Sequence, residues 1–294
     1  MAMGQHIRNP IEWWWDHLKL TTNAVGSAAQ ALDDALEVRD TAPPEVRRID
    51  LADIRDALRE GLADFGAFRT DVIFLCIVYP IAGIVLSRIA FGHGMLPLIF
   101  PLASGFALIG PLVAVGLYEM SRRRERGVHT NWLHAFGVVR SPAFGAMLML
   151  GLLLLAIFAL WQVAAFAIYN ATLGPAMPTS LTSFVADVFT TKAGWIMIAA
   201  GDGVGFLFAA VVLTISVVSF PLLLDRDVGL STAIVTSVRA VRANPGPMAA
   251  WGLIVAAALV VGAIPVLLGY AIVIPVLGHA TWHLYRKVVP RRAA

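Results

Sequence analysis

Residues 143–169 read AFGAMLMLGLLLLAIFALWQVAAFAIY, an uninterrupted apolar run without a charged side chain. A helix needs about 20 mostly apolar residues to cross the hydrocarbon core of a bilayer. The rest of the chain supports a membrane protein, because 59% of its 294 residues are hydrophobic and only 14% are charged, whereas soluble domains carry about 25% charged residues. The sequence therefore predicts an all-α polytopic membrane protein.

Other stretches meet the same requirement of length and hydropathy. The block 247–285 is about twice the length of one span. It holds Gly262, Pro265 and Gly269 near its middle, so we expect a hairpin of two helices there. Further single spans are expected at 72–92, 97–120 and 203–224. Together with 143–169 and the hairpin, they predict about six transmembrane helices within a membrane domain at 50–287.

The distribution of charge predicts the orientation of these spans, because the short loops on the cytoplasmic side of a membrane protein carry an excess of Lys and Arg. Twelve of these cations lie after the second span, after the fourth span and in the C-terminal tail. The turns near 93–96 and 263–267 hold none, and the connection 170–202 holds only Lys192. We therefore expect a multi-pass protein of the bacterial inner membrane with both termini in the cytoplasm.

A short pattern occurs three times ahead of an expected span. Apolar residues recur at every third position and end just before Arg69, Arg140 and Arg242. Positions three apart lie along one stripe of a helix, so each segment is expected to lie at the cytoplasmic interface with its cations near anionic lipid headgroups. The pattern predicts three parallel repeats, each an interfacial amphipathic helix plus a two-span hairpin. The apolar positions are Leu62, Phe65 and Phe68, then Leu133, Phe136 and Val139, and finally Val235, Val238 and Val241.

The three units are expected near 50–120, 129–224 and 230–287. The first begins near DIRDALREGLADF, residues 53–65, and Asp50 just before this stretch is expected to cap a helix. The second has an enlarged outer connection, 170–202, in which we expect a further helix at the periplasmic face. The apolar side of the first unit's helix is predicted from its spacing to comprise Ile54, Leu58, Leu62 and Phe65.

Both ends of the chain carry candidate membrane-interface anchors. The segment 1–49 is expected to be a cytoplasmic leader, flexible in part, and 288–294 form a basic C-terminal tail. Trp and Tyr gather where a membrane protein meets the headgroups. The expected anchors are Trp13, Trp14, Trp15, Trp282 and Tyr285.

Signatures of enzymatic chemistry are missing from the sequence, which has no Walker loop, no H-E-x-x-H, no C-x-x-C and no G-x-S-x-G. His279 and His283 lie four residues apart and share one helix face. They are weak candidates for a haem or metal site if a third ligand such as His129 or His134 joins them. Anchoring at the membrane interface is the alternative interpretation, and we expect no bound cofactor.

Polar residues gather at the expected cytoplasmic face. Glu119 and Asp225 end the second and fourth spans beside Arg122 and Arg226, where ion pairs are favoured over a proton relay. The candidate cluster at this face comprises Glu119, Asp225, Arg226, Asp227, Arg239, Arg242, Asn244, His279, His283 and Arg286.

Four stretches of the chain resemble a known family. They read ADIRDALREGLADF, GPLVAVGLYEMSRR, PLLLDRDVGLSTAIVTSVRAVRANPGPM and GHATWHLYR. They resemble blocks of a family of uncharacterised bacterial predicted integral membrane proteins, some of whose members are described as cytochrome c oxidase subunits. The resemblance covers about 50–287 and implies a six-span inner-membrane protein of unassigned activity. A haem-copper catalytic subunit needs several histidines within its spans, and this chain has none deep in a span, so an oxidase connection would be that of an accessory or assembly partner.

Three functions are compatible with these observations. The first is a non-enzymatic scaffold, assembly factor or accessory subunit that binds the lipid bilayer and other membrane-protein subunits, and not nucleic acid. The second is a carrier or channel for a small or lipid-like solute, which would need a cavity near the midplane. The third is a haem- or metal-binding accessory protein of a respiratory oxidase. Polar residues that could line a midplane cavity are Ser104, Gln162, Thr214 and Ser216.

Overall fold

The computed structural model describes residues 43–76, 101–102, 110–112, 114–128, 130, 135, 137–138, 141–174, 178, 180–264 and 268–291. Within these ranges the regular elements are helices, in agreement with the predicted class. They are α2 (Leu51–Cys76), α5 (Val115–Glu125), α6 (Phe144–Thr172), α7 (Leu181–Thr190), α8 (Lys192–Ser216), α9 (Ser219–Asp225), α10 (Leu230–Ala243), α11 (Pro245–Ala263) and α12 (Tyr270–Val288).

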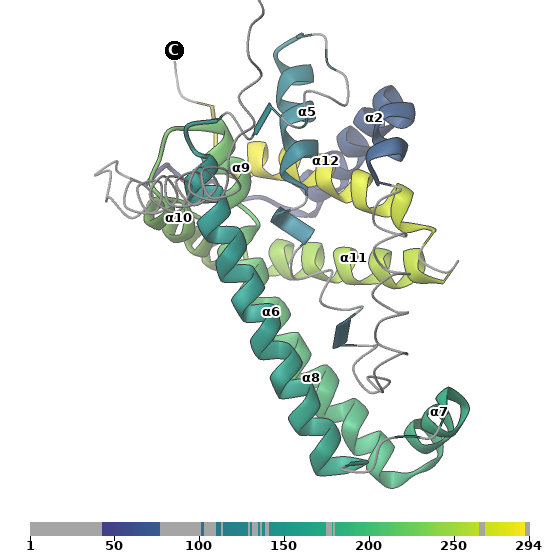
Figure 1. Cartoon of the computed structure of the whole chain (residues 1–294). Coiled ribbons are helices and arrows are strands. Elements are labelled where there is room, and N and C mark those ends of the chain that lie inside the picture. The colour runs from purple at the N-terminus through teal and green to yellow at the C-terminus, as the bar shows by residue number, and fades with distance from the viewer. Residues whose placement is uncertain are drawn as a thin grey trace, which may run out of the picture.

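Among the described residues, three helical segments are long and apolar enough to cross a membrane: α6, the continuous segment Lys192–Asp225 that joins α8 to α9, and α11. Figure 1 shows α6 and α8 side by side, extending away from the other long helices, with α7 next to their far ends. Large apolar side chains on this pair are exposed, among them Leu160, Phe206 and Leu207. A bilayer is the solvent that covers such a surface.

The expected spans agree with the structure where a long apolar run decides them. The span 143–169 is confirmed by α6. The block 247–285 forms the two helices α11 and α12, as expected, but α12 does not meet the length and hydropathy requirement for a span. Most of the first two expected spans falls on 77–100 and 103–109, outside the described residues. Six spans are therefore not confirmed.

The fourth span is longer than the sequence indicated. The helix begins at Lys192 instead of near 203, because the Thr191 side chain accepts a hydrogen bond from Gly194 N at 2.9 Å and caps it. Lys192 and Asp202 fall in the connection 170–202 of the predicted topology, but both lie in the N-terminal half of this helix. The expected outer helix of the connection 170–202 is α7, which Ser180 caps.

Helix α2 packs against α12 through small side chains. Its start is capped as expected: Asp53 N donates to Asp50 Oδ1 and Asp50 N donates to Asp53 Oδ2, both at 3.0 Å. A Cβ added to Gly61 would lie 2.5 Å from the backbone nitrogen of Ala280, so the two backbones are in close contact. This face needs residues without bulk.

The buried face of α2 therefore differs from the apolar side that the spacing indicated. Ile54 is buried, but Leu62 is 58% exposed and Leu58 and Phe65 are half-buried. Periodicity finds an apolar stripe without showing whether protein or another apolar phase covers it, and most of this stripe is not covered by the described part of the protein. The face that packs on α12 comprises Ile54, Ala57, Gly61 and Asp64.

Helix α10 shows the same distinction. Its buried residues are small or polar, whereas Val235 is exposed and Val238 and Val241 are half-buried. Ser219 Oγ donates to Ala233 O at 3.1 Å, and Val218 N donates to Ser237 Oγ at 3.2 Å, which join α10 to the turn before α9. The buried set is Thr232, Ala233, Thr236, Ser237 and Ala240.

The threefold repeat stays a prediction. The second copy of the pattern, which ends at Arg140, lies outside the described residues. The first copy continues without a break through α2 to Cys76, whereas the third ends at Ala243 and a new helix starts at Pro245. The two described copies thus differ in how they join the following segment.

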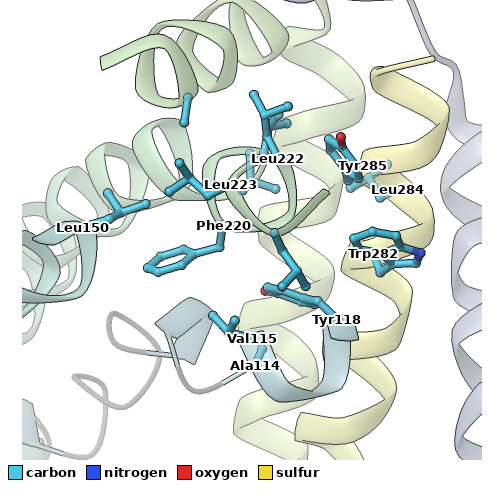
Figure 2. Packing of buried hydrophobic residues seen from close by; sticks show 14 of the residues in the cluster. Ala114, Val115, Tyr118, Leu150, Phe220, Leu222, Leu223, Trp282, Leu284 and Tyr285 are labelled. Carbon is cyan, nitrogen blue, oxygen red and sulfur yellow. The ribbon is translucent and has the colours of Figure 1, made fainter. Parts of the chain in front are cut away.

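The apolar core lies where α5, α6, α9 and α12 meet. Figure 2 shows Phe220 and Leu223 of α9 between Leu150 of α6 and the aromatic side chains Tyr118 and Trp282. Phe220, Leu150 and Trp282 are fully buried. Burial of a side chain of this size contributes about 1.5–3 kcal/mol to folding. This core holds the polar ends of α5 and α12 beside α2.

Candidate functional site

Five polar side chains form a continuous hydrogen-bonded chain between α2, α5 and α12. His283 of α12 contacts two carboxylates of α2, with Nδ1 2.8 Å from Glu60 Oε2 and Nε2 2.8 Å from Asp64 Oδ2. Ser121 Oγ of α5 donates to the same Asp64 oxygen at 2.6 Å and lies 2.8 Å from His279 Nδ1. The chain therefore runs from exposed Glu60 to His279, which has no exposed surface.

The geometry assigns the protons in this chain. Both ring nitrogens of His283 face a carboxylate, and an imidazole can donate from both nitrogens only as the cation. Because the single Ser121 hydroxyl proton goes to Asp64, His279 Nδ1 must be the donor to Ser121 Oγ. His279 Nε2 is then a buried nitrogen without a hydrogen-bond partner among the described residues.

Asp64 is the centre of this arrangement. Arg124 Nη1 of α5 donates to its second oxygen at 2.9 Å, so one carboxylate joins three helices. Burial acts to raise the pKa of Asp64, but hydrogen bonds from His283 and Ser121 and the charge of His283 outweigh it and hold the pKa below the ordinary value of 3.8. Asp64 is thus an anion in a buried position that its partners stabilise.

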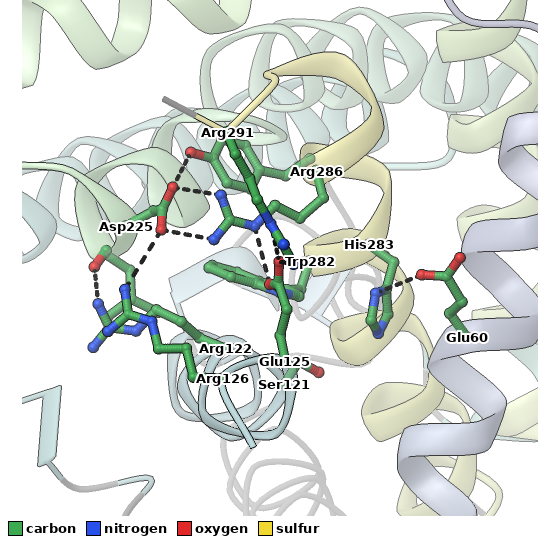
Figure 3. Close-up of polar contacts among 12 residues, drawn as sticks. Glu60, Ser121, Arg122, Glu125, Arg126, Asp225, Trp282, His283, Arg286 and Arg291 are labelled. Atoms are coloured by element: carbon green, nitrogen blue, oxygen red, sulfur yellow. Dashed lines mark hydrogen bonds and ion pairs between the residues drawn. The ribbon is translucent and has the colours of Figure 1, made fainter. Parts of the chain in front are cut away.

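A second cluster joins α5, α9 and the end of α12. Arg286 donates to both oxygens of Asp225, at 2.7 and 2.9 Å, and to Glu125 Oε2 at 3.0 Å. Figure 3 shows Arg286 between these two carboxylates, with Arg291 on the outer side of Glu125. Burial acts to raise the pKa of Glu125, but the hydrogen bond from Arg291 and the charge of Arg286 lower it overall.

Trp282 and Tyr285 are components of this cluster and not lipid-facing anchors. Both side chains are fully buried. Trp282 Nε1 donates to Glu125 Oε2 at 3.0 Å, and the Tyr285 hydroxyl donates to Asp225 Oδ2 at 2.9 Å. The Arg286 guanidinium lies 4.8 Å from the Trp282 ring centroid, a cation–π contact. The expectation of interface anchoring therefore does not hold for these two residues, because their polar atoms are needed by buried carboxylates.

Glu119 and Asp225 form ion pairs, as expected, but with partly different partners. Glu119 pairs with Arg122 and Arg123 of its own helix, each at 2.6 Å. Asp225 is 3.8 Å from Arg226, its expected partner, whereas the shorter contacts are those with Arg286. Arg122 also donates to Leu224 O at 2.6 Å and so joins α5 to α9.

Asn244 fastens the segment before α2 to the corner between α10 and α11. Its Oδ1 accepts from Ile49 N at 2.7 Å, and its Nδ2 donates to Arg47 O and Ala240 O, both at 3.0 Å. The side chain is buried. Its role is therefore to hold the beginning of the described chain against a helix corner near the other end.

The other predicted cluster residues lie apart from these contacts. Arg226 donates to the backbone oxygen of Pro290. Asp227, Arg239 and Arg242 are exposed. The structure thus separates the predicted cluster into members of a buried network and charged residues at the surface.

The paired histidines do not form the expected type of metal or haem site in the described part of the chain. His279 and His283 bind Ser121 and the α2 carboxylates, and no group of three or more His, Cys, Asp or Glu there could hold a metal ion. His129 and His134, the proposed third ligands, lie outside the described residues, as do Trp13, Trp14 and Trp15.

Two of the polar residues expected to line a midplane cavity, Thr214 and Ser216, give no support for one. Thr214 donates to Ala210 O at 2.7 Å and Ser216 to Val212 O at 2.6 Å, both within α8. Their hydroxyls are satisfied by their own helix. Ser104 lies outside the described residues.

We call the side chains that join these helices the ionic junction: Glu60, Asp64, Ser121, Arg124, Glu125, Asp225, His279, Trp282, His283, Tyr285 and Arg286. Sequence reasoning missed Glu60, Asp64, Ser121, Arg124 and Glu125 as members of the site. The only signal for them was spacing, because Glu60 and Asp64 are four residues apart on α2, as are His279 and His283 on α12.

The ionic junction buries its charges, and the apolar helices next to it expose leucine and phenylalanine. This arrangement is typical of a membrane protein. Residues 99–225 match the model of a family described as predicted integral membrane proteins (DUF2189). This range includes α5 to α9 and so reaches from the ionic junction to the far end of the apolar pair. No curated protein and no solved structure matches the chain. The family description supports an integral membrane protein and assigns no activity.

Proposed function

We propose that this protein is a non-enzymatic scaffold or accessory subunit of the bacterial inner membrane, which holds other membrane-protein subunits in place. The ionic junction carries this proposal, because its charged groups are matched to one another within the protein. A catalytic acid, base or nucleophile has to reach a substrate. Asp64 is only 5% exposed, and Ser121 and His279 have no exposed surface.

The junction also has the mechanical property that a scaffold needs. It joins α2, close to the beginning of the described chain, to α12, close to the end of the described chain. The backbones of the two helices are in direct contact at Gly61. Buried ion pairs of this kind fix one arrangement of helices more than they add stability. A partner that binds this end of the protein would meet a fixed surface.

The outer face of α2 is the surface we assign to a partner subunit. Leu51 and Leu62 are 62% and 58% exposed on this helix, and Leu58 is half-buried between them. The charged residues Arg55 and Arg59 lie on the same helix. An apolar stripe flanked by cations suits a subunit with an apolar helix and acidic residues.

The orientation is part of the proposal. The clustering of arginine at the ends of α5, α10 and α12 supports a cytoplasmic location for the junction and for both termini. Six spans in three parallel units, with α11 and α12 as the last hairpin, are our proposal for the complete membrane domain.

Site-specific photo-crosslinking in cells tests the scaffold role. A crosslinking amino acid at Leu62 is expected to give one protein adduct, identified by mass spectrometry, at a yield that follows the expression level of that partner. The matched position is Asp56, which is exposed on the same helix but outside the stripe and its flanking cations. Lipid adducts alone at Leu62, with no protein adduct, would overturn the proposal.

A further inference from the structure

A cavity of about 360 Å³ lies between α6, α7 and α8, at the end of the α6–α8 pair that is remote from α9. Ligand-binding cavities commonly have volumes of about 300–1,000 Å³. Aromatic side chains from two helices line it: Trp161 and Tyr169 of α6, and Phe184 and Phe189 of α7. The cavity is therefore large enough for a small molecule and has the apolar walls that favour one.

Helix α8 leaves room for the cavity through a glycine. A Cβ added to Gly201, which lines the cavity, would have no atom within 4 Å. Asp202 follows it and is the charged residue among those that line the cavity. Asp202 is exposed, and no cation pairs with it in the described part of the chain. The connection 170–202 holds two acids, Asp187 and Asp202, and one cation, Lys192.

We propose that this cavity binds an amphiphile with an apolar body and one ammonium group. The body fills the space between α6 and α7, and the ammonium group lies at Asp202. Aromatic walls attract a cation through the negative faces of their rings, and the carboxylate supplies the opposite charge. An anionic head would meet repulsion from Asp202, and a neutral head would leave the carboxylate without a partner. The site is separate from the ionic junction and goes beyond the scaffold role.

Three probes with the same body test the charge preference. They are 6-phenylhexylamine, 6-phenylhexanol and 6-phenylhexanoate, which are cationic, neutral and anionic at pH 7. Binding to the full chain in nanodiscs of zwitterionic lipid is measured by equilibrium dialysis, with empty nanodiscs subtracted. We expect the amine to bind about three- to tenfold more tightly than the alcohol, because a partly exposed ion pair and a cation–π contact are each modest. The carboxylate is expected to bind most weakly.

Two pairs of variants locate the site. Gly201→Leu fills the cavity and is expected to abolish binding of all three probes, whereas Gly203→Leu, at another open position of α8 that does not line the cavity, is expected to leave it unchanged. Asp202→Asn is expected to remove the preference for the amine and keep binding of the alcohol. Asp187→Asn, an exposed acid outside the lining, is expected to keep the preference.

Each contrary result has a definite meaning. Equal binding of the three probes to the natural chain would overturn the ammonium assignment. Equal binding to the Gly201→Leu and Gly203→Leu variants would overturn the cavity as the site. Neither result bears on the adduct at Leu62, so failure here and failure of the scaffold proposal are distinguishable.

Discussion

The two ends of this molecule place polar and apolar side chains in opposite ways. In the ionic junction Asp64 and Ser121 are buried, whereas Leu62, two residues before Asp64 on α2, is exposed. On the α6–α8 pair, leucine and phenylalanine cover the outside, and the hydroxyls of Thr214 and Ser216 bond within their own helix. Matched charges join the helices at one end, whereas the other end exposes an apolar surface that is suited to lipid.

The difference shows what each end can tolerate. In the junction a lost partner leaves a buried charge, which costs more than the pair itself contributes. On the apolar pair an added charge must enter lipid, which costs free energy at insertion. Variants at the two ends should therefore fail in different assays, one in unfolding and the other in membrane integration.

The largest effect is expected at Asp64. Asp64→Ala removes the acceptor shared by His283, Ser121 and Arg124, and we expect it to lower the free energy of unfolding by about 3–5 kcal/mol. Unfolding is followed by tryptophan fluorescence in mixed micelles of increasing denaturing detergent. Asp56→Ala is the control, because Asp56 is 52% exposed in its side chain and lies 3.8 Å from Lys287, a contact worth about 0–1 kcal/mol. Similar losses in the two variants would contradict a special role for the junction.

A charge on the apolar pair should act on insertion instead. Leu160 is 60% exposed near the middle of α6, and Leu160→Asp is expected to make insertion of this helix less favourable by about 2.5–3.5 kcal/mol. The measurement is the fraction of protein that resists alkaline carbonate extraction. Ala52→Asp, exposed in the first turn of α2, is expected to leave that fraction unchanged. Full integration of Leu160→Asp would mean that α6 does not face lipid at this point.

The contact between α2 and α12 gives a smaller effect with a change of sign. Gly61→Ala places a Cβ 2.5 Å from Ala280 N, which is backbone and cannot move aside alone, so we expect a loss of about 1–3 kcal/mol in unfolding free energy. Gly66→Ala on the same helix meets no atom within 4 Å and is expected to gain about 0.5–1 kcal/mol from helix propensity. A gain in both variants would show that the helices are not in close contact.

The sequence predicted the apolar end better than the junction. A long apolar run has one stable outcome in a membrane, so α6 begins within a residue of the expected span and extends three residues past its end. The start of α8 was missed because the apolar stretch before Gly203 was assigned to a separate helix of the outer connection, although a helix end can carry Lys192 outside the hydrocarbon core. Length and hydropathy decide these elements, and both are local properties.

The junction could not be predicted because its partners are distant in sequence. Asp64 and His283 are 219 residues apart, and Trp282 and Glu125 are 157 apart. Residue type alone favoured an interface for Trp282 and Tyr285, but their polar atoms were taken by carboxylates that no local pattern indicates. The apolar stripes of α2 and α10 were identified from their spacing. The faces that pack against other helices consist instead mainly of small residues, because small residues let two helix backbones approach closely.

Lowering the pH gives the mildest test of the comparison, because a protonated carboxyl keeps some of its hydrogen bonds. The pKa values of Asp64 and Glu125 are lowered in the folded protein from 3.8 and 4.5. A lowered pKa contributes stability that is fully present above the unfolded value and is lost as the pH falls through the folded value. We therefore expect the unfolding midpoint to be flat above about pH 5 and to fall below about pH 4.5, with a smaller fall in Asp64→Asn and Glu125→Gln than in the natural chain. Integration of α6, which has no carboxylate, should not follow this curve when membranes are first held at each pH and then extracted with alkaline carbonate, and a parallel loss of both would contradict the separation of the two ends.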